Sequence, residues 1–330
     1  RPRVSQENGL NVVRVDLPAW LPKARWIDAR AAFSQLEQAF RVYVRRFGRP
    51  DVLHAHSLYP AGFLTHLLAA KYGLPWVLTE HRSLGHMPVR TGLGRRAEQQ
   101  VAASAAKRIG VSRGHADFIA QRLGGQWDYV PNLLPPELEA VTVSDHSGKP
   151  LVVGHLSVLD PVKRPELVIK SFAAAQLGAD ARLIIGGPLT DEIESSLRQC
   201  ARQVGVEKQL ELPGMVKDVA GFNQQLDVFV LPSITESFGM VLIEALATGA
   251  ALVATDTWGA NTVISDGDGV VVASADPTEL GAAIKQVSTW PRDKAGRERR
   301  RESCLSRFAL GAFAAKYKEI YAVAAASAHA

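Results

Sequence analysis

The sequence predicts an α/β fold built from two successive doubly wound units. Short apolar runs alternate with amphipathic helical stretches along the chain, which is typical of parallel strands joined by helices. The chain has 330 residues, and at roughly 150 residues per domain that length indicates two domains. Apolar residues make up 47% and charged residues 22%, a globular composition that excludes disordered and fibrous proteins.

The first unit begins with a short apolar run and a helix. The run is Asn11–Val15, and apolar residues at spacings of three and four predict a helix from Phe33 to Phe47. A second helix is expected over Ala61–Tyr72, where Gly73 ends it. The buried strands of this unit are predicted at Asp51–His54, Trp76–Thr79, Arg108–Val111 and Tyr129–Val130.

A polar, proline-bearing segment, Pro135–Pro150, separates the two units and is the predicted domain boundary. Beyond it the alternation of strands and helices restarts. Strands are predicted at Leu151–Leu156, Arg182–Ile185, Leu226–Leu231 and Ala251–Ala254, and helices over Pro165–Leu177, Asp191–Val204, Met240–Thr248 and Phe308–Val323. The predicted divisions are residues 1–140, a linker at 141–150, residues 151–307 and a final helical segment at 308–330.

The net charge of +5 is modest for this length. It permits contact with phosphates or with an anionic membrane surface, but it does not indicate a nucleic-acid-binding protein. No stretch approaches the roughly 20 apolar residues that span a bilayer. Cys200 and Cys304 are too few to staple a fold of this size, so a reducing cytoplasm is the expected location.

The most informative stretch follows the strand that ends at Leu231 and carries two glutamates, Glu236 in a loop and Glu244 near the start of a helix. Gly239 lets the backbone turn before that helix begins near Met240. The unpaired N–H groups and positive dipole end of a helix start suit a phosphate. A carboxylate one turn further accepts hydrogen bonds from the two hydroxyls of a ribose. Two isolated glutamates more often form a solvated loop acid and a helix-surface acid.

The whole string from Glu236 to Glu244, followed by Ala245-Leu-Ala-Thr-Gly249, resembles the Glu-x7-Glu signature of the retaining GT-B glycosyltransferases of family 4. The resemblance covers about residues 50–325 and implies two Rossmann-like domains that face each other across a cleft. It implies an enzyme that moves a sugar from a nucleoside diphosphate to an acceptor hydroxyl with retention of configuration. Glu236 would then be a catalytic residue that orients the sugar hydroxyls, and Glu244 would bind the donor. Donor binding is also implied for Ser237, Phe238, Gly239, Met240 and Val241.

Two further segments of the second unit match the family in order. Gly154-His-Leu-Ser157, together with Lys163-Arg164-Pro165, resembles the strand, loop and helix that hold the donor diphosphate. Lys163 is therefore implied as a catalytic phosphate contact. A later segment, Leu212-Pro-Gly-Met-Val216, matches a region that contacts the nucleotide base in relatives. The donor-binding residues implied by these segments are His155, which stands where the family usually has an arginine, Arg164, Met215 and Val216.

In the first unit, Leu78-Thr-Glu-His-Arg82 resembles a strand end whose histidine faces the transferred sugar in relatives. His81 is therefore implied as a catalytic, sugar-positioning residue, and this domain would select the acceptor, which would be a glycan, a lipid-linked glycan or a small molecule. The family's first strand, glycine-rich loop and following helix have no counterpart here, so the amino-terminal part of this domain is expected to be missing. Trp258-Gly-Ala-Asn-Thr262 resembles the family's Gly-Gly-x-x-Glu loop, with Trp258 and Thr262 as departures.

The resemblance implies neither a metal nor a cofactor, because a lysine and a helix start would stabilise the leaving diphosphate and the sugar nucleotide is a co-substrate. Arginines in the first unit are compatible with a peripheral contact to an anionic membrane, although such runs more often form a solvated face. The mixed-charge run Arg297–Glu302 is expected on an exposed helix face. The arginines considered for membrane contact are Arg41, Arg45, Arg46, Arg49, Arg90, Arg95 and Arg96.

Other functions fit parts of the pattern. A non-catalytic sugar-nucleotide- or glycan-binding protein of the same fold would keep Glu244 but lack turnover, and a GT-B-type phosphorylase would need extra cations around a free phosphate. His54 and His56 lie on one face of a strand and could bind a metal, but His81 is the only other histidine at a convincing strand end. A nicotinamide-dependent dehydrogenase is disfavoured, because no Gly-x-Gly-x-x-Gly follows a strand.

Overall fold

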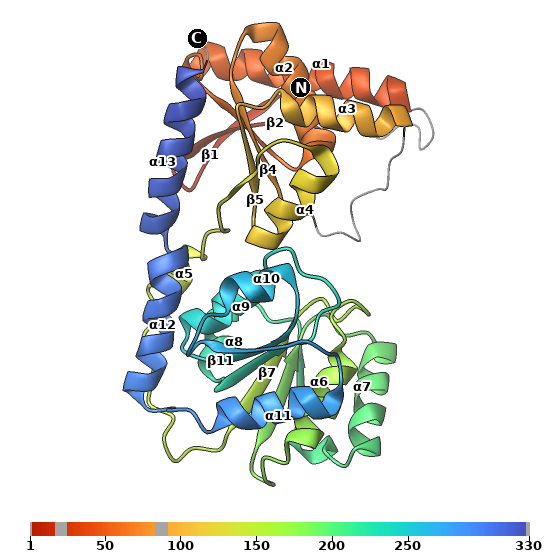
Figure 1. The fold of residues 1–330 in the computed structure, drawn as a ribbon, viewed down its shortest axis with the longest axis vertical. Coiled ribbons are helices and arrows are strands. Elements are labelled where there is room, and N and C mark those ends of the chain that lie inside the picture. The colour runs from red at the N-terminus through yellow and green to blue at the C-terminus, as the bar shows by residue number, and fades with distance from the viewer. Residues whose placement is uncertain (1, 17–24, 83–91, 328–330) are drawn as a thin grey trace.

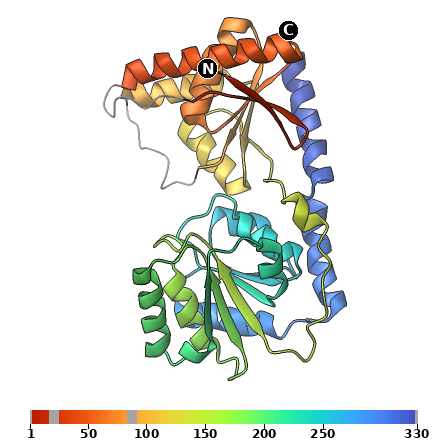
Figure 2. The same cartoon turned by 180° about the vertical axis from the view of Figure 1, so that it is seen from behind.

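The computed structural model describes residues 2–16, 25–82 and 92–327, and it consists of two α/β halves stacked along the long axis of the molecule (Figures 1 and 2). The two-unit α/β fold predicted from the sequence is confirmed. Of the arginines considered for membrane contact, Arg90 lies outside the described residues.

The first half is built on a four-stranded parallel sheet with the strand order β3-β4-β5-β6. Its central strand β4 is buried at every residue because helices cover both faces of the sheet. A separate antiparallel pair, β1 (Arg3–Glu7) and β2 (Leu10–Arg14), precedes the sheet. The remaining elements are α1 (Arg25–Phe47), β3 (Leu53–His56), α2 (Phe63–Tyr72), β4 (Trp76–Glu80), α3 (Gly92–Ala103), β5 (Lys107–Gly110), α4 (Arg113–Leu123) and β6 (Asp128–Tyr129).

The second half is built on a six-stranded parallel sheet with the order β12-β11-β10-β7-β8-β9. The strands are β7 (Val152–Leu156), β8 (Arg182–Gly186), β9 (Leu210–Gly214), β10 (Val228–Leu231), β11 (Ala251–Thr255) and β12 (Gly269–Val272). The helices are α6 (Pro165–Ala175), α7 (Asp191–Gln203), α8 (Val219–Gln224), α9 (Met240–Ala247), α10 (Trp258–Val263) and α11 (Pro277–Ser288).

The strand order of this sheet reverses between β7 and β10, which pair directly. The loops that follow these two strands leave the sheet at the same edge and diverge, which opens a crevice in doubly wound folds. Both loops carry residues that the sequence pattern singled out, Lys163 after β7 and Glu236 after β10. The topology therefore brings two segments about 70 residues apart in the chain to one place.

The chain crosses between the halves twice. The first crossing includes the short helix α5 (Pro136–Glu139), and the second runs from α12 (Lys294–Phe308) into α13 (Leu310–Ala326), which extends along the first half (Figure 1). Tyr317 and Ile320 of α13 pack against Val77 and Ile109 of the first sheet. The final helix thus completes the core of the first half.

Three sequence predictions differ from the structure. Strand β3 covers Leu53–His56, two residues later than predicted. The strands β1, β9 and β12 and the helices α3, α4, α5, α8, α10 and α11 were not predicted as elements, and α12 was expected only as a helix around Arg297–Glu302. The expectation that Arg297–Glu302 forms an exposed face is wrong, because Arg297, Arg300 and Arg301 are buried. Their guanidinium groups donate to backbone carbonyl oxygens at the ends of α8 and α9, including those of Thr248 and Ala247 at 2.9 Å.

Candidate active site

A cavity of about 660 Å³ lies between the two halves, where the carboxyl ends of their strands meet. Strand ends and loops of the first half supply one wall, which contains His81, Arg82, Val111 and Asn132. The loops after β7 and β10, the start of α9 and the segment from the end of β9 to the start of α8 supply the other wall. The residues on that wall are Leu156, Ser157, Val158, Asp160, Val162, Lys163, Val216, Val219, Thr235, Glu236, Ser237, Phe238, Gly239, Met240, Val241 and Glu244.

Lys163 and Glu236 form an ion pair in this wall. Lys163 Nζ lies 2.5 Å from Glu236 Oε2, and both side chains are largely shielded from solvent. The backbone N–H of Lys163 donates to the carboxylate of Asp160 at 3.0 Å, which fixes the loop that carries the lysine. The structure therefore brings together a cation and a carboxylate predicted from two separate motifs.

The start of α9 is shaped by its glycines. Gly239, which precedes the first helical residue, has φ of 83°, a conformation that side chains other than glycine rarely adopt. Gly259 of α10 approaches the same loop, and its N–H donates to the Glu236 carbonyl at 3.0 Å. A Cβ at Gly259 would lie 2.4 Å from the Phe238 carbonyl oxygen. The backbone of α10 thus packs closely against the loop before α9 and supports it.

Two polar groups in this wall, in Ser237 and Glu244, form no hydrogen bond or ion pair with another residue that the structure describes. The hydroxyl of Ser237 is buried and has no hydrogen bond among the residues the structure describes. Glu244 lies in the wall one turn into α9. Burial, followed by the negative charge of Glu137, raises the pKa of the Glu244 carboxyl. A buried polar group without a partner is unfavourable, so both residues are ready to accept or donate hydrogen bonds to a ligand.

His81 projects from the end of β4 into the opposite wall. Its Nε2 lies 2.8 Å from Nδ1 of His56. Burial and the neighbouring His56 lower the pKa of His81, and the charge of Glu80 and a hydrogen bond with Asn132 oppose this shift. His81 is therefore neutral near pH 7, which suits hydrogen bonding to a sugar hydroxyl better than delivery of a charge.

Three of the predicted donor-binding residues do not line the cavity. The side chain of His155 is completely buried, with Nδ1 at 2.8 Å from the Val230 carbonyl and Nε2 at 2.8 Å from the Ser157 hydroxyl. A direct donor contact by His155 is therefore not available, and it instead orients Ser157 in the cavity wall. Arg164 lines a neighbouring surface cavity, and Met215 is 65% exposed outside the site. Val216, in contrast, lies in the wall as predicted.

Sequence reasoning missed the first-half residues Arg82 and Asn132 and the loop residue Asp160. Arg82 is the last residue of the segment Leu78–Arg82, which was matched to a strand end, and Asn132 follows the predicted strand Tyr129–Val130, so a search of strand-end neighbours would have included both. Nothing in the local sequence indicates that these residues face Lys163, since only the packing of the two halves brings them together.

No group of three or more metal-ligating side chains is found among the described residues. His54 is engaged on both ring nitrogens, by Tyr321 and Thr79 at 2.8 Å each, so the His54–His56 pair is not arranged as a metal site. The chain contains an Asp-x-Asp sequence at Asp266–Asp268, but Asp268 is buried in an ion pair with Arg307 at 2.6 Å. That carboxylate serves the fold and lies outside the cavity.

The two halves also touch through Trp258, the first residue of α10. Its ring lies 4.9 Å from the ring of Phe118 and 5.7 Å from that of His115, both on α4 of the first half. Trp258 stands at the position of the first glycine in the family's Gly-Gly-x-x-Glu loop, and here it begins α10. The aromatic contact holds α10, and with it the loop before α9, against the first half.

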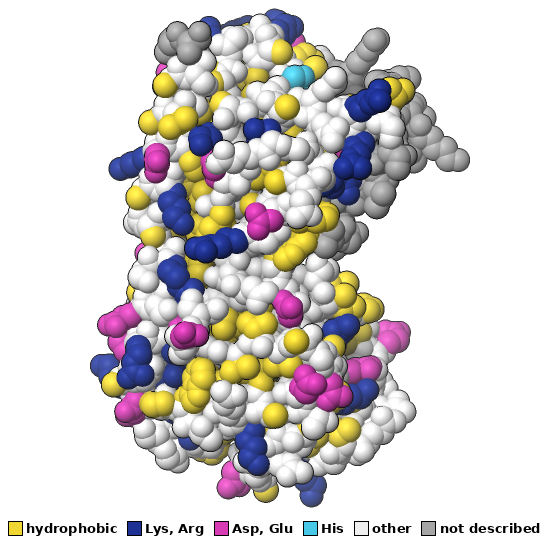
Figure 3. Space-filling model, in the orientation of Figure 1, with side chains coloured by type: hydrophobic (Ala, Val, Ile, Leu, Met, Phe, Trp, Pro, Cys, Tyr) yellow, Lys and Arg dark blue, Asp and Glu magenta, His cyan; other side chains and the backbone are white. Residues whose placement is uncertain are grey.

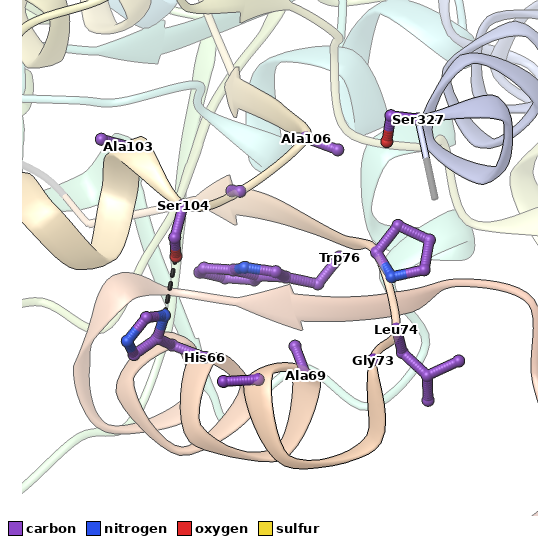
Figure 4. Close-up of a pocket in the computed structure, with 12 residues that line it drawn as sticks. His66, Ala69, Gly73, Leu74, Trp76, Ala103, Ser104, Ala106 and Ser327 are labelled. Atoms are coloured by element: carbon purple, nitrogen blue, oxygen red, sulfur yellow. Dashed lines mark hydrogen bonds between the residues drawn. The ribbon is translucent and has the colours of Figure 1, made fainter. Parts of the chain in front are cut away.

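A second cavity of about 570 Å³ opens at the far end of the first half, near the beginnings of β4 and β5 (Figure 4). His66 Nδ1 lies 2.7 Å from the Ser104 hydroxyl beside the ring of Trp76. Most of its lining is alanine, glycine, leucine and proline. It contains none of the motif residues, so the cavity between the halves is the candidate active site.

The chain matches two family models in succession. Residues 1–132 match the glycosyl transferase 4-like domain, and residues 139–302 match glycosyl transferases group 1. None of the described helices is long and apolar enough to span a membrane.

Curated relatives include D-inositol 3-phosphate glycosyltransferases. The one from Geodermatophilus obscurus is 27% identical over 73% of this chain and 60% of its own length. The one from Frankia alni is 26% identical over 84% of this chain and 73% of its own length. The chain thus spans about 60% of the length of the first of these relatives.

Solved structures share the fold at low identity. Sucrose-phosphate synthase from Thermosynechococcus elongatus superimposes with a TM-score of 0.74 at 19% identity, over 97% of this chain and 85% of that protein. HepE from Anabaena, solved with UDP and glucose, gives a TM-score of 0.70 at 20% identity, over 88% and 83% of the two chains.

Proposed function

The chain belongs to the GT-B glycosyltransferases of family 4, and on that premise we propose that it moves a sugar from a nucleoside diphosphate to an acceptor hydroxyl with retention of configuration. The observation that carries the proposal is the convergence of Lys163, Glu236, the start of α9 and Glu244 in one cavity between the halves. These groups match the chemical parts of a sugar nucleotide, which has a sugar, a diphosphate and a ribose.

The donor would occupy the second-half wall. Glu244 accepts hydrogen bonds from the ribose hydroxyls, and Lys163 and the N–H groups before α9 contact the diphosphate. Ser237, Phe238, Gly239, Met240 and Val241 line this wall around the diphosphate, and Val216 lies beside the base. Lys163 is already paired with Glu236, so donor binding would exchange part of that ion pair for a phosphate contact.

In the reaction, the bond between the anomeric carbon and the diphosphate oxygen breaks, and a bond from that carbon to the acceptor oxygen forms on the same face. The proton of the acceptor hydroxyl passes to the leaving diphosphate. Lys163 and the backbone N–H groups stabilise the negative charge that grows on the diphosphate. Glu236 and the neutral His81 position the sugar from opposite walls. In this scheme Lys163 and the backbone amides stabilise the charge of the leaving diphosphate, so the scheme requires no metal.

The acceptor would enter from the first half and would be a glycan, a lipid-linked glycan or a small molecule. The curated relatives from Geodermatophilus obscurus and Frankia alni carry the name D-inositol 3-phosphate glycosyltransferase, which contains a phosphorylated inositol. Basic side chains on the face shown in Figure 3 are spread over both halves and interspersed with acidic ones. We include a peripheral contact with an anionic membrane through the exposed Arg45 and Arg46 of α1, in the cytoplasm, as part of the proposal.

The test is turnover with a panel of sugar nucleotides. We expect the protein to release one nucleoside diphosphate from its matching sugar nucleotide faster than buffer does, and faster still when an acceptor is supplied. A protein that binds a sugar nucleotide without releasing the diphosphate in any acceptor mixture would instead be a binding protein of the same fold. A protein that requires inorganic phosphate and a glycoside would be a phosphorylase.

A further inference from the structure

Charged side chains of both signs line the cavity, and the carboxylates outnumber the cations. Its lining includes the cations Arg82 and Lys163 and the carboxylates of Asp160, Glu236 and Glu244. Lys163 is paired with Glu236 at 2.5 Å. Within the described ranges, no hydrogen bond or ion pair involves the guanidinium of Arg82. Among the described residues, Arg82 is thus a cation of the lining that is not committed to a partner, on the wall opposite Lys163.

The backbone of Arg82 is held by buried groups. Its N–H donates to Glu80 Oε1 at 3.0 Å, and the same oxygen accepts the N–H of His81 at 2.9 Å. The other oxygen of Glu80, a residue only 1% exposed, accepts the N–H of Leu58 at 2.7 Å. One buried carboxylate thus fixes the turn after β4 on which His81 and Arg82 sit.

His115 holds the other side of that turn. Its Nε2 lies 2.9 Å from the Arg82 carbonyl oxygen, which can only accept, so Nε2 carries the proton. Burial lowers the pKa of His115 to about 4, so the ring is neutral near pH 7. The backbone of Arg82 is therefore anchored at both its N–H and its carbonyl, while its guanidinium has no hydrogen-bond or ion-pair partner among the residues that the structure describes.

Resting on the function proposed above, we propose that the Arg82 guanidinium binds a phosphate group of a substrate in the cavity. A guanidinium offers parallel N–H groups that match two phosphate oxygens, and the shielded cavity strengthens that contact relative to bulk water. The anchored backbone reduces the ordering that binding requires. The phosphate is either that of the donor diphosphate or one carried by the acceptor, and the experiment separates these two sources.

The variants are Arg82→Gln, which removes the charge, and Arg82→Lys, which keeps the charge but lacks the parallel N–H groups of a guanidinium. Arg299→Gln is the matched control, because Arg299 is an exposed arginine on α12 that does not line the cavity. Thermal unfolding of each variant verifies the fold. Because no hydrogen bond or ion pair among the described residues involves the Arg82 guanidinium, we expect melting curves like that of the parent protein.

The first arm measures calorimetric binding of UDP, GDP, ADP and the corresponding nucleosides. If Arg82 contacts the donor, Arg82→Gln weakens the binding of the preferred diphosphate about 10- to 100-fold, leaves the nucleoside unchanged and flattens the salt dependence. Arg82→Lys restores part of the affinity, and Arg299→Gln leaves nucleotide binding unchanged.

The second arm measures binding of inorganic phosphate to protein saturated with the preferred diphosphate. If Arg82 contacts an acceptor phosphate, the parent protein binds inorganic phosphate under these conditions. The affinity of Arg82→Gln for inorganic phosphate is then lower by about 10-fold or more. The proposal is overturned if Arg82→Gln matches the parent protein in both arms. If no nucleotide binds the parent protein, the proposed function fails, and phosphate binding to the free protein still tests Arg82 on its own.

Discussion

At the scale of single residues, the site depends on charges that the fold keeps partly shielded. Lys163 and Glu236 neutralise each other across the crevice between β7 and β10. The Ser237 hydroxyl is buried without a hydrogen-bond partner in the described structure, and partial burial of Glu244 raises the pKa of its carboxyl, so the surroundings of both groups are unfavourable until a ligand arrives. This arrangement trades some stability of the free protein for affinity, as functional sites commonly do.

Replacing Lys163 by alanine should lower the turnover rate more than it weakens donor binding, because the lysine charge meets a negative charge that grows in the transition state. We expect kcat to fall by about 100- to 1000-fold, with a smaller change in KM. Lys163→Arg keeps the charge and should recover part of the rate. Steady-state kinetics measure both effects, and retained turnover in Lys163→Ala would exclude the phosphate contact.

Replacing Glu244 by glutamine should stabilise the free protein at neutral pH. Burial raises the pKa of Glu244 in the folded state, so folding favours its protonated form. That contribution is fully present below the unfolded-state pKa and is lost as the pH rises through the folded-state pKa. The stability difference between Glu244→Gln and the parent protein should therefore be small near pH 4 and favour the variant near pH 7.

Urea unfolding at both pH values measures that difference. Glu319, an exposed glutamate of α13, provides the matched control, since Glu319→Gln removes the same charge from a solvated position. Equal pH profiles for Glu244→Gln and the parent protein would contradict the description of Glu244 as a buried carboxylate.

At the scale of elements, the loop before α9 depends on close approach by α10. Gly259→Ala places a Cβ 2.4 Å from the Phe238 carbonyl oxygen, and backbone atoms cannot rotate aside as a side chain can. We expect this variant to displace Glu236 and Ser237 and to weaken nucleotide binding at least 10-fold, because charge-assisted hydrogen bonds depend on geometry.

Gly311→Ala is the control for that variant. Gly311 lies in the first turn of α13, and a Cβ there would meet nothing within 4 Å. This substitution should raise stability by about 0.5–1 kcal/mol and leave nucleotide binding unchanged. Calorimetry and thermal unfolding compare the two variants, and equal nucleotide affinity in Gly259→Ala and the parent protein would show that α10 does not support the loop.

The sequence was sufficient for elements whose pattern is strong. The apolar runs of β7, β10 and β11 and the motif around α9 were predicted close to their observed bounds. Helix α12 was expected only around Arg297–Glu302 and with an exposed face. The burial of Arg297, Arg300 and Arg301 could not be predicted, because it becomes favourable only when backbone carbonyls from other elements accept their hydrogen bonds. The residues of the second-half wall could be predicted from local motifs. Arg82 and Asn132 of the opposite wall face them only because the two halves pack together.

At the scale of the whole molecule, the candidate site exists only while the two halves face each other. The crossing helix α13 and the contact of Trp258 with Phe118 and His115 both join the halves. The first is part of a core, while the second is a small aromatic contact beside the cavity, worth about 0.5–1.5 kcal/mol beyond its buried area. Trp258 is therefore the place where the spacing of the halves is most easily changed.

Replacing Trp258 by alanine should let the halves separate more often. Small-angle X-ray scattering should give a larger radius of gyration for Trp258→Ala than for the parent protein, and Trp258→Phe, which keeps an aromatic ring, should fall between them. Nucleotide affinity should fall less than for Glu244 variants, because most donor contacts lie in the second half. Scattering curves that superimpose for all three proteins would exclude a role for Trp258 in domain spacing.

The central claim is that the cavity between the halves binds a nucleoside diphosphate through Glu244 and the start of α9. Calorimetric titration of UDP, GDP and ADP into the parent protein, Glu244→Gln and the control Glu319→Gln tests it most directly. We predict that one nucleotide binds the parent protein and Glu319→Gln equally, and binds Glu244→Gln about 10- to 100-fold more weakly. Binding of none of the three nucleotides, or equal binding to all three proteins, would contradict the claim.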